Sequence, residues 1–238
     1  GAIDSTALLL RSTSSDFPNG LGNSAGLIGR YLHDHPKDWW PATSEVALTS
    51  LAHPAYLSRG AYDPETPLMA TSLTIGLAKR SQRIGTYVRA KSASLGVQVF
   101  GTMIPRPDVG VSVSRDLADA IECRPRLTLS YDQAAIDNVV SARQRLREVF
   151  AASGLGVAVD GPFDPIVPGR SVHYGGSVRM HSSPEFGALD RNNRLYDVPN
   201  VVVCDSSCFT TGPEKNPTLT AMAIAARAAD HLADELTG

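Results

Sequence analysis

The chain has 238 residues, of which 42% are hydrophobic and 19% charged, a composition typical of a folded globular protein and not of a disordered one. Its net charge of −2 argues against a nucleic-acid-binding surface, and no apolar run reaches the roughly 18–20 residues that span a bilayer. The three cysteines (Cys123, Cys204 and Cys208) form no disulfide framework, so the sequence favours a cytoplasmic location, with a removed export signal as the alternative.

The first 42 residues predict a helix followed by a glycine-rich loop. Ile3, Ala7, Leu8 and Leu10 have helical spacing. The loop "FPNGLGNSAGLIGRYLHDHP" has several Gly and Pro residues, which predict turns with positive φ. Its "GLGNSAG" has the spacing G-x-G-x-x-x-G and no strand before it, so it does not predict a phosphate-binding turn.

Residues 43–131 predict strands with one buried face, most simply in an antiparallel sheet. The candidate strands are "EVALTSL", "GTYVRAK", "GVQVFGTMI", "VGVSVSR" and "RLTLSYD". Apolar residues recur there two positions apart: Val97 and Val99, Val111 and Val113, Leu127 and Leu129. The segment "TPLMATSLTIGLAKRS" predicts a helix that crosses this sheet.

A second helix is predicted between the N-cap residue Asp132 and Gly154. One apolar stripe runs along it: Ile136, Val139, Val140, Leu146, Val149 and Phe150. The three arginines Arg143, Arg145 and Arg147 are expected to face solvent.

From residue 166 onward the sequence again predicts α/β structure. "NVVVCD" predicts a strand buried on both faces, and "KNPTLTAMAIAARAADHLADEL" a long helix with Asn216 as N-cap and Pro217 as first helical residue. The order predicts an α/β fold with an α+β insertion, in which residues 1–42 and 166–238 form a partial Rossmann-like domain and residues 43–165 an antiparallel-sheet domain.

Two stretches carry the candidate chemistry: "SVHYGGSVRM" around His173 and "GPEKNPTLT" around Asn216. The two glycines beside His173 let a planar group approach the backbone closely, and the imidazole can take a proton. A helix that begins at Asn216 presents free N–H groups and the positive end of its dipole, which stabilise an anion. A base beside such a helix end is what hydride abstraction from an alcohol onto a flavin requires.

These stretches resemble the glucose–methanol–choline (GMC) flavoprotein oxidoreductases. "HYGGSVRM" is similar to the family's H-P-x-G-T-x-R-M motif, "VVVCDSS" to its strand ending in D-x-S, and "KNPTLT" to its N-P-x-x-T helix start, with "GALDRNNRLYDVPN" between the first two. "GAIDSTALLLRS" and "GLIGRYLHDHP" are similar to segments further upstream in the family. Tyr174, Ser177 and His181 depart from the usual Pro, Thr and Gly, which bears on the choice of substrate.

The resemblance implies FAD as cofactor and oxidation of an alcohol, with a sugar or polyol favoured. It makes His173 the base that accepts the hydroxyl proton and places Asn216 where the family has Asn or His bonded to the substrate oxygen. It assigns cofactor contacts to six residues: Gly1, Ala2, Asp205, Ser206, Pro217 and Thr218. The electron acceptor stays open between oxygen, a quinone and a cytochrome.

The resemblance covers only the C-terminal half of the family pattern, because no G-x-G-x-x-G occurs in the chain. The sequence therefore predicts a missing N-terminal FAD-binding half as a partner. The alternatives are a non-catalytic fragment or subunit, and a sugar-binding module.

Each candidate residue also has a purely structural explanation. His173 could be a core histidine, Asn216 a helix cap, and Asp205 the end of a strand at a turn. His33 and His35 have the H-x-H spacing of a metal pair, but no third ligand accompanies them, so no metal site is predicted.

Overall fold

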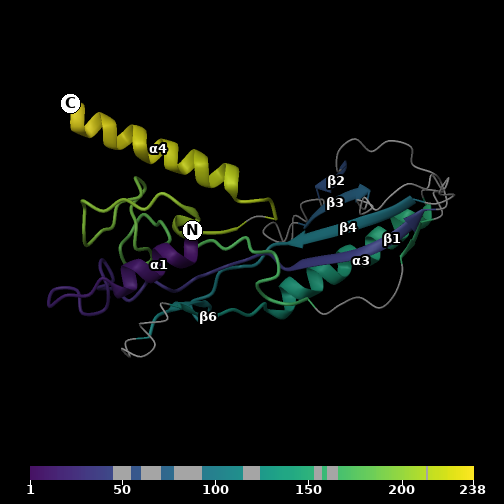
Figure 1. Ribbon diagram of the computed structural model, residues 1–238, viewed down its shortest axis with the longest axis horizontal. Coiled ribbons are helices and arrows are strands. Elements are labelled where there is room, and N and C mark those ends of the chain that lie inside the picture. The colour runs from purple at the N-terminus through teal and green to yellow at the C-terminus, as the bar shows by residue number, and fades with distance from the viewer. Residues whose placement is uncertain are drawn as a thin grey trace, which may run out of the picture. The chain divides into compact units, whose positions relative to one another are not determined.

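The computed structural model describes residues 1–44, 55–59, 71–77, 93–114, 124–152, 157–159, 166–212 and 214–238. The elements are α1 (Ala2–Arg11), β1 (Lys37–Ser44), β2 (Ala55–Arg59), β3 (Thr71–Leu77), β4 (Ala93–Gly101), β5 (Gly110–Ser112), β6 (Arg126–Thr128), α3 (Gln133–Ala152), β7 (Val157–Val159), the 3₁₀ helix η1 (Ser206–Cys208) and α4 (Thr218–Thr237) (Figure 1). They form two compact units: unit 1 (Gly1–His35, Met103–Ser130 and Ser171–Gly238) and unit 2 (Pro36–Thr102 and Tyr131–Arg170). The functional division predicted at residues 42 and 165 stays a prediction.

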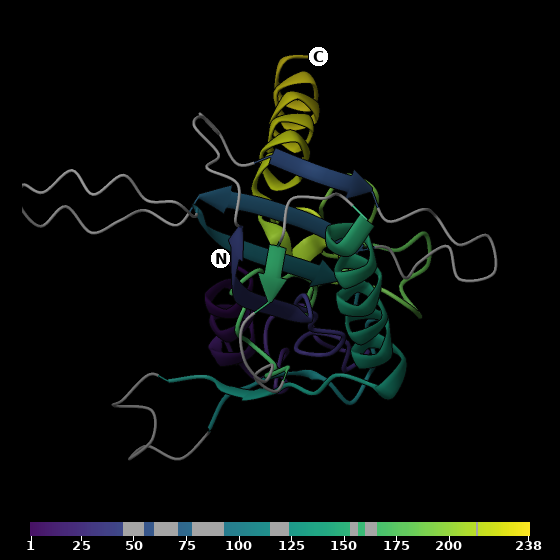
Figure 2. The same cartoon turned by 90° about the vertical axis from the view of Figure 1, so that its right-hand side faces the viewer.

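Unit 2 contains a five-stranded sheet in the order β2-β3-β4-β1-β7, whose paired strands are all antiparallel. The helix α3 packs along this sheet (Figure 2). The approach is close, because a β-carbon built at Gly101 of β4 would lie 2.7 Å from Val139 Cγ2 of α3. A glycine at this position therefore lets the helix lie directly on the strand.

Three of the strands predicted from alternating residues are confirmed. "GVQVFGTMI" contains most of β4, which pairs with both β1 and β3. "VGVSVSR" and "RLTLSYD" contain β5 and β6, but these two strands pair with each other in a separate small sheet of unit 1. "GTYVRAK" lies outside the described residues, as does "EVALTSL".

The helix predicted for "TPLMATSLTIGLAKRS" is wrong over its described part, which is the strand β3. Thr71–Leu77 pairs with β4 in a continuous register from Thr71 opposite Gly101 to Leu77 opposite Leu95. The alternation of threonine and serine with leucine and isoleucine suits a strand that already has a partner. The long-range pairing thus overrides the local helical spacing.

The helix predicted between Asp132 and Gly154 is confirmed at its N-cap, but two of its residues do not face the predicted side. The Asp132 carboxylate accepts the Ala135 N–H at 2.8 Å, as expected of an N-cap. Val139 is fully buried, whereas Val140 is exposed. Arg143 does not face solvent but forms an ion pair with the buried Asp38 of β1.

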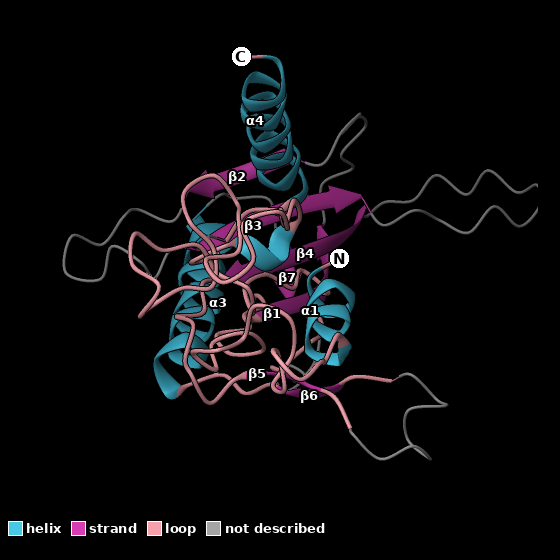
Figure 3. Ribbon diagram, turned by 90° about the vertical axis from the view of Figure 1, so that its left-hand side faces the viewer, coloured by secondary structure: helices cyan, strands magenta, loops and turns pink. Residues whose placement is uncertain are grey.

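Unit 1 consists largely of loops, packed between α1 and α4 (Figure 3). Its apolar core is a cluster of Leu9, Ile28, Val178, Ala188, Leu189, Leu195, Val203, Cys208 and Phe209. The strand predicted for "NVVVCD" is wrong, because Val202 forms only an isolated bridge with Arg194. Among the described residues, the backbone of this segment pairs with residues 193–195 on one side only. It therefore does not form a strand in the interior of a sheet.

The helix α4 covers the core cluster with one side, through Ala221 and Ile224, and Ala228 of the same helix is buried. Leu219 and Met222 are 78% and 64% exposed. Within the described residues, no helix combines the length and the apolar character needed to cross a bilayer.

Replacing Arg143 by Ala should destabilise unit 2, because the buried Asp38 loses its ion-pair partner. Removing one member of a buried pair costs about 3–5 kcal/mol of unfolding free energy. Denaturant unfolding measures the loss. The exposed Arg145 on the same helix gives the matched control, since Arg145→Ala should change stability by less than about 0.5 kcal/mol. Equal losses in the two variants would contradict a structural role for the Arg143–Asp38 pair.

Candidate active site

His173 lies in a turn that begins at a strained residue. Val172 has a φ of +53°, in the left-handed region that β-branched residues rarely adopt, and it is 73% exposed. His173 is half-buried, and the buried Gly175 and Gly176 follow it after Tyr174. Strained backbone persists only where its surroundings hold it, and it is concentrated at functional sites.

The buried residue Asp34 binds this turn through hydrogen bonds. Asp34 Oδ1 accepts the His173 backbone N–H at 2.9 Å and the hydroxyl of Ser171. Ser171 Oγ also accepts the His35 N–H at 3.3 Å. The imidazole of His35 meets that of His173 edge to face, with ring centroids 5.2 Å apart. Burial and, secondarily, the Asp34 carboxylate raise the pKa of the Tyr174 phenol.

His33 pairs with the same segment through its backbone. The His33 N–H donates to the Gly175 carbonyl at 2.9 Å, and the Gly175 N–H donates back at 3.0 Å. The imidazole of His33 is buried, and its Nε2 has no hydrogen-bond partner among the described residues. Burial, followed by the repulsion of His35, lowers the pKa of His33 to about 3. His33 is therefore neutral near pH 7.

Three glycines make the room that the His33 imidazole occupies. A β-carbon built at Gly175 would lie 2.5 Å from His33 Cε1, and one built at Gly212 would lie 2.5 Å from Nδ1. One built at Gly176 would lie 3.0 Å from Cδ2. The ring thus contacts both the segment that follows His173 and the one that precedes Asn216.

Asn216 is exposed at the start of α4. The helix begins at Thr218, with Pro217 as the N-cap at φ −80° and ψ −15°, so the predicted start is one residue early. The Ala221 N–H donates to the Pro217 carbonyl at 2.9 Å. Pro217 already has helical dihedral angles, which explains the difference of one residue.

Three of the predicted cofactor residues, Gly1, Ala2 and Asp205, lie around the start of α1. Asp205 accepts the Ser207 N–H at 2.7 Å and the Ser5 hydroxyl, and its Oδ2 lies 3.6 Å from the Gly1 nitrogen. Burial alone raises the pKa of Asp205, but the hydrogen bonds from Ser207 and Ser5 outweigh it, so the pKa is lower than usual. Ala2 is buried at the start of α1.

The η1 turn is bonded to the His173 segment. The Ser206 hydroxyl donates to the Tyr174 carbonyl at 2.9 Å, and the Gly176 N–H donates to the Ser206 carbonyl at 2.9 Å. The structure therefore joins the segments of His173, Asp205 and Ser206 by direct hydrogen bonds, and His33 joins the His173 segment to the one that leads to Asn216.

Sequence reasoning missed the roles of His33, Asp34 and Ser171. The "HDHP" stretch is compared with a metal pair and, within "GLIGRYLHDHP", with a segment of the family pattern, but neither comparison gives Asp34 a role, and Ser171 is not among the candidate residues. The available signal was an aspartate between two histidines in a glycine-rich loop, because binding and catalytic residues are often found on loops. Among the residues described, no three His, Cys, Asp or Glu side chains are grouped closely enough for a metal ion.

A family model described as GMC oxidoreductase matches residues 105–225. The 2-methyl-1,2-propanediol dehydrogenase of Mycolicibacterium austroafricanum is 28% identical over 97% of this chain and 46% of its own length. The fructose dehydrogenase large subunit of Gluconobacter japonicus is 23% identical over 98% of this chain and 46% of its own length.

Among solved structures, pyridoxine 4-oxidase from Mesorbium loti is similar, with a TM-score of 0.53 and 23% identity over 97% of this chain and 50% of that chain. The likeness supports the same fold over the length of the chain. The chain spans about half the length of the curated relatives it matches.

The pKa of about 3 at His33 predicts a loss of stability in acid. The unfolded state takes up a proton near pH 6.5 and the folded state only near 3, so this contribution is complete above pH 6.5 and is lost as the pH falls toward 3. The slope approaches about 1.4 kcal/mol per pH unit. The other titratable side chains on the two paired segments are Asp34, His35, His173 and Tyr174.

Denaturant unfolding at a series of pH values measures this slope. His33→Asn should be less stable near neutrality and should lose most of the slope between the two pKa values. His231→Gln on α4 is the control and should keep the slope. A wild-type stability that stays constant between pH 6.5 and 4 would contradict a buried neutral His33.

Proposed function

Because the chain belongs to the GMC oxidoreductase family, we propose that it carries the catalytic segment of a flavin-dependent enzyme that oxidises the CH–OH group of an alcohol. One observation supports this most directly. The half-buried His173 sits on a strained and tightly bonded turn, and the ring of His33 connects that turn to the segment that leads to Asn216. These contacts support a site in unit 1 with His173 as the acid–base group and Asn216 as a hydrogen-bond donor.

GMC oxidoreductases are generally flavin-dependent, and the donors at the start of α4 suit the electron-rich end of a flavin ring. The first turn of this 20-residue helix precedes its first internal hydrogen bond, so the backbone N–H groups there have no partner within the helix. Thr218, Leu219 and Thr220 are exposed at this point. Their N–H groups and the helix dipole would stabilise a negative charge.

The other predicted cofactor residues would serve the remaining parts of FAD. Pro217 and Thr218 would lie at the ring. Asp205 and Ser206, with Gly1 and Ala2 at the start of α1, would contact the ribityl or pyrophosphate part. The hydrogen bonds between η1 and the His173 segment support a shared site.

In the proposed reaction the His173 imidazole takes the hydroxyl proton of the alcohol, and the Asn216 amide donates a hydrogen bond to the same oxygen. When bound, FAD supplies the acceptor for the hydride that leaves the alcohol carbon. The N–H groups in the first turn of α4 stabilise nearby negative charge by about 0.3–1 kcal/mol per contact. The alcohol leaves as a carbonyl compound.

We favour a sugar or polyol as substrate. Two of the relatives support this choice, since one is named for 2-methyl-1,2-propanediol and the other for fructose. The finer fold assignment follows the same family pattern: residues 1–42 and 166–238 would be part of the FAD-binding domain, and residues 43–165 would be the substrate domain.

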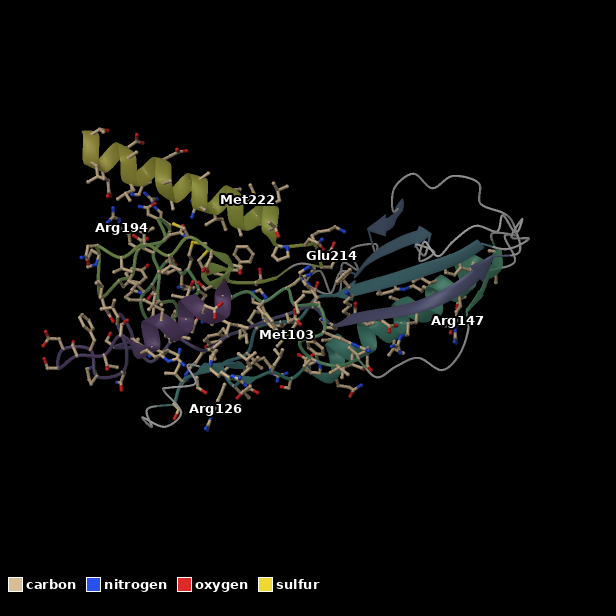
Figure 4. The ribbon with its side chains drawn as sticks, viewed as in Figure 1. Met103, Arg126, Arg147, Arg194, Glu214 and Met222 are labelled. Atoms are coloured by element: carbon tan, nitrogen blue, oxygen red, sulfur yellow. The ribbon has the colours of Figure 1, made fainter. Side chains whose placement is uncertain are left out.

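We further propose a polypeptide partner for the exposed side of α4, on which Figure 4 labels Met222. Ala221, Ile224 and Ala228 face the core of unit 1, whereas Leu219, Met222, Ala223 and Ala226 lie on the opposite side of the helix and are exposed. A helix that is apolar all round is normally buried all round. The occupant would be the rest of the FAD-binding domain, the part of the relatives' length that this chain does not match, in the same polypeptide or another.

Replacing His173 by Ala in the flavin-loaded protein should slow reduction of the flavin by an alcohol about 10²- to 10⁴-fold, because the general base is lost. Anaerobic stopped-flow absorbance measures the rate, and the flavin content should not change. His231→Ala on α4 is the control and should reduce at the normal rate. Near-normal reduction by His173→Ala would contradict the proposal, and a flavin that no alcohol reduces in the wild type would favour the alternative of a non-catalytic subunit.

Replacing Met222 by Glu should weaken association with the rest of the FAD-binding domain and lower the flavin content of the purified protein. A charge buried in an apolar interface without a partner costs several kcal/mol. Size-exclusion chromatography and flavin absorbance report the two effects. Val140→Glu makes the same change at an exposed apolar residue of α3 and serves as the control. If Met222→Glu assembles like the wild type, the exposed side of α4 does not bind this partner.

A further inference from the structure

Asp34 is a buried carboxylate that bonds to the His173 turn. Its side chain is 1% exposed. Oδ1 accepts the His173 backbone N–H at 2.9 Å and the Ser171 hydroxyl. Hydrogen bonds to a carboxylate are stronger than those between neutral groups, and burial strengthens them further.

The contact closes a small ring of hydrogen bonds around Val172. Ser171 Oγ lies 3.4 Å from the His173 nitrogen as well as 3.3 Å from that of His35. The two residues on either side of Val172 are thus fixed to the same carboxylate, which explains how a β-branched residue keeps a φ of +53°. The bonds to Asp34 offset the strain of the turn.

The same loop holds the turn on its far side. His33, directly before Asp34, pairs with Gly175 through two backbone hydrogen bonds of 2.9 and 3.0 Å. The backbone is therefore fixed at two points, at His173 itself by Asp34 and at Gly175 by His33. The edge-to-face contact with the ring of His35 limits its imidazole as well.

We propose that Asp34 is a positioning residue that sets the place of the His173 imidazole by fixing the backbone on which it stands. This inference rests on the function proposed above, in which His173 is the base. A catalytic group has to be held within about 0.5 Å of its productive place. A displacement of about 1 Å can cost on the order of 100-fold in rate.

Two variants test the proposal. Asp34→Asn keeps the shape of the side chain and an oxygen that can accept both donors, but it removes the charge that strengthens the two hydrogen bonds. Ser171→Ala removes the bridging hydroxyl and leaves Asp34 in place, so it remains informative if Asp34→Asn does not fold. Asp190→Asn is the matched control, since Asp190 accepts the N–H groups of Asn192 and Arg194 in a turn elsewhere in unit 1.

The first readout is hydrogen–deuterium exchange of residues 170–177, which needs no turnover. Asp34→Asn should speed exchange there at least about tenfold and leave α1 and α4 unchanged, with a smaller change in the same direction for Ser171→Ala. Asp190→Asn should not change the exchange rates of residues 170–177. Unchanged exchange in both test variants, or faster exchange throughout unit 1, would overturn the proposal.

The second readout is steady-state and stopped-flow kinetics of the flavin-loaded protein. Asp34→Asn should lower kcat about tenfold or more, with KM and flavin content close to those of the wild type. A change in KM or flavin content without a change in kcat would also overturn the proposal. If the wild type itself oxidises no alcohol while Asp34→Asn still speeds exchange at residues 170–177, the proposed function fails and the positioning contact stands.

Discussion

The arrangement of unit 1 depends on the contact between His33–His35 and the turn around His173. Asp34 and His173 are 139 positions apart in the chain, yet the carboxylate of one accepts the backbone N–H of the other. Unit 1 has few regular elements, so its loops cannot rely on a ladder of strand or helix hydrogen bonds. Buried side-chain acceptors and short backbone bridges supply hydrogen-bond partners to these loops instead.

The proposed site combines two kinds of structure. The helix α4 offers a dipole and free N–H groups because any long helix does so at its first turn. The His173 turn has no such intrinsic stability and is specified by its neighbours, residue by residue. The match to the family model covers residues 105–225, which include His173 and Asn216 but not the loop of Asp34.

Local patterns in the sequence predicted the elements whose causes are local. The N-cap of α3, the long helix α4 and the alternation of β4 were all readable, and the family motifs singled out His173 and Asn216. β3 was misread because its pairing with β4, which no spacing shows, decides between strand and helix. Asp34, Ser171 and the role of Arg143 were missed for a related reason, since each depends on a partner far away in the chain.

The glycines around His33 bear on how the sequence can vary. With a histidine at position 33, neither position 175 nor position 212 has space for even a methyl group. The three sites can therefore change only as a set: a smaller residue at 33 has to appear before either glycine is replaced. Related sequences should be found in two separate groups at these positions, and single-site libraries built on this chain cannot pass from one group to the other.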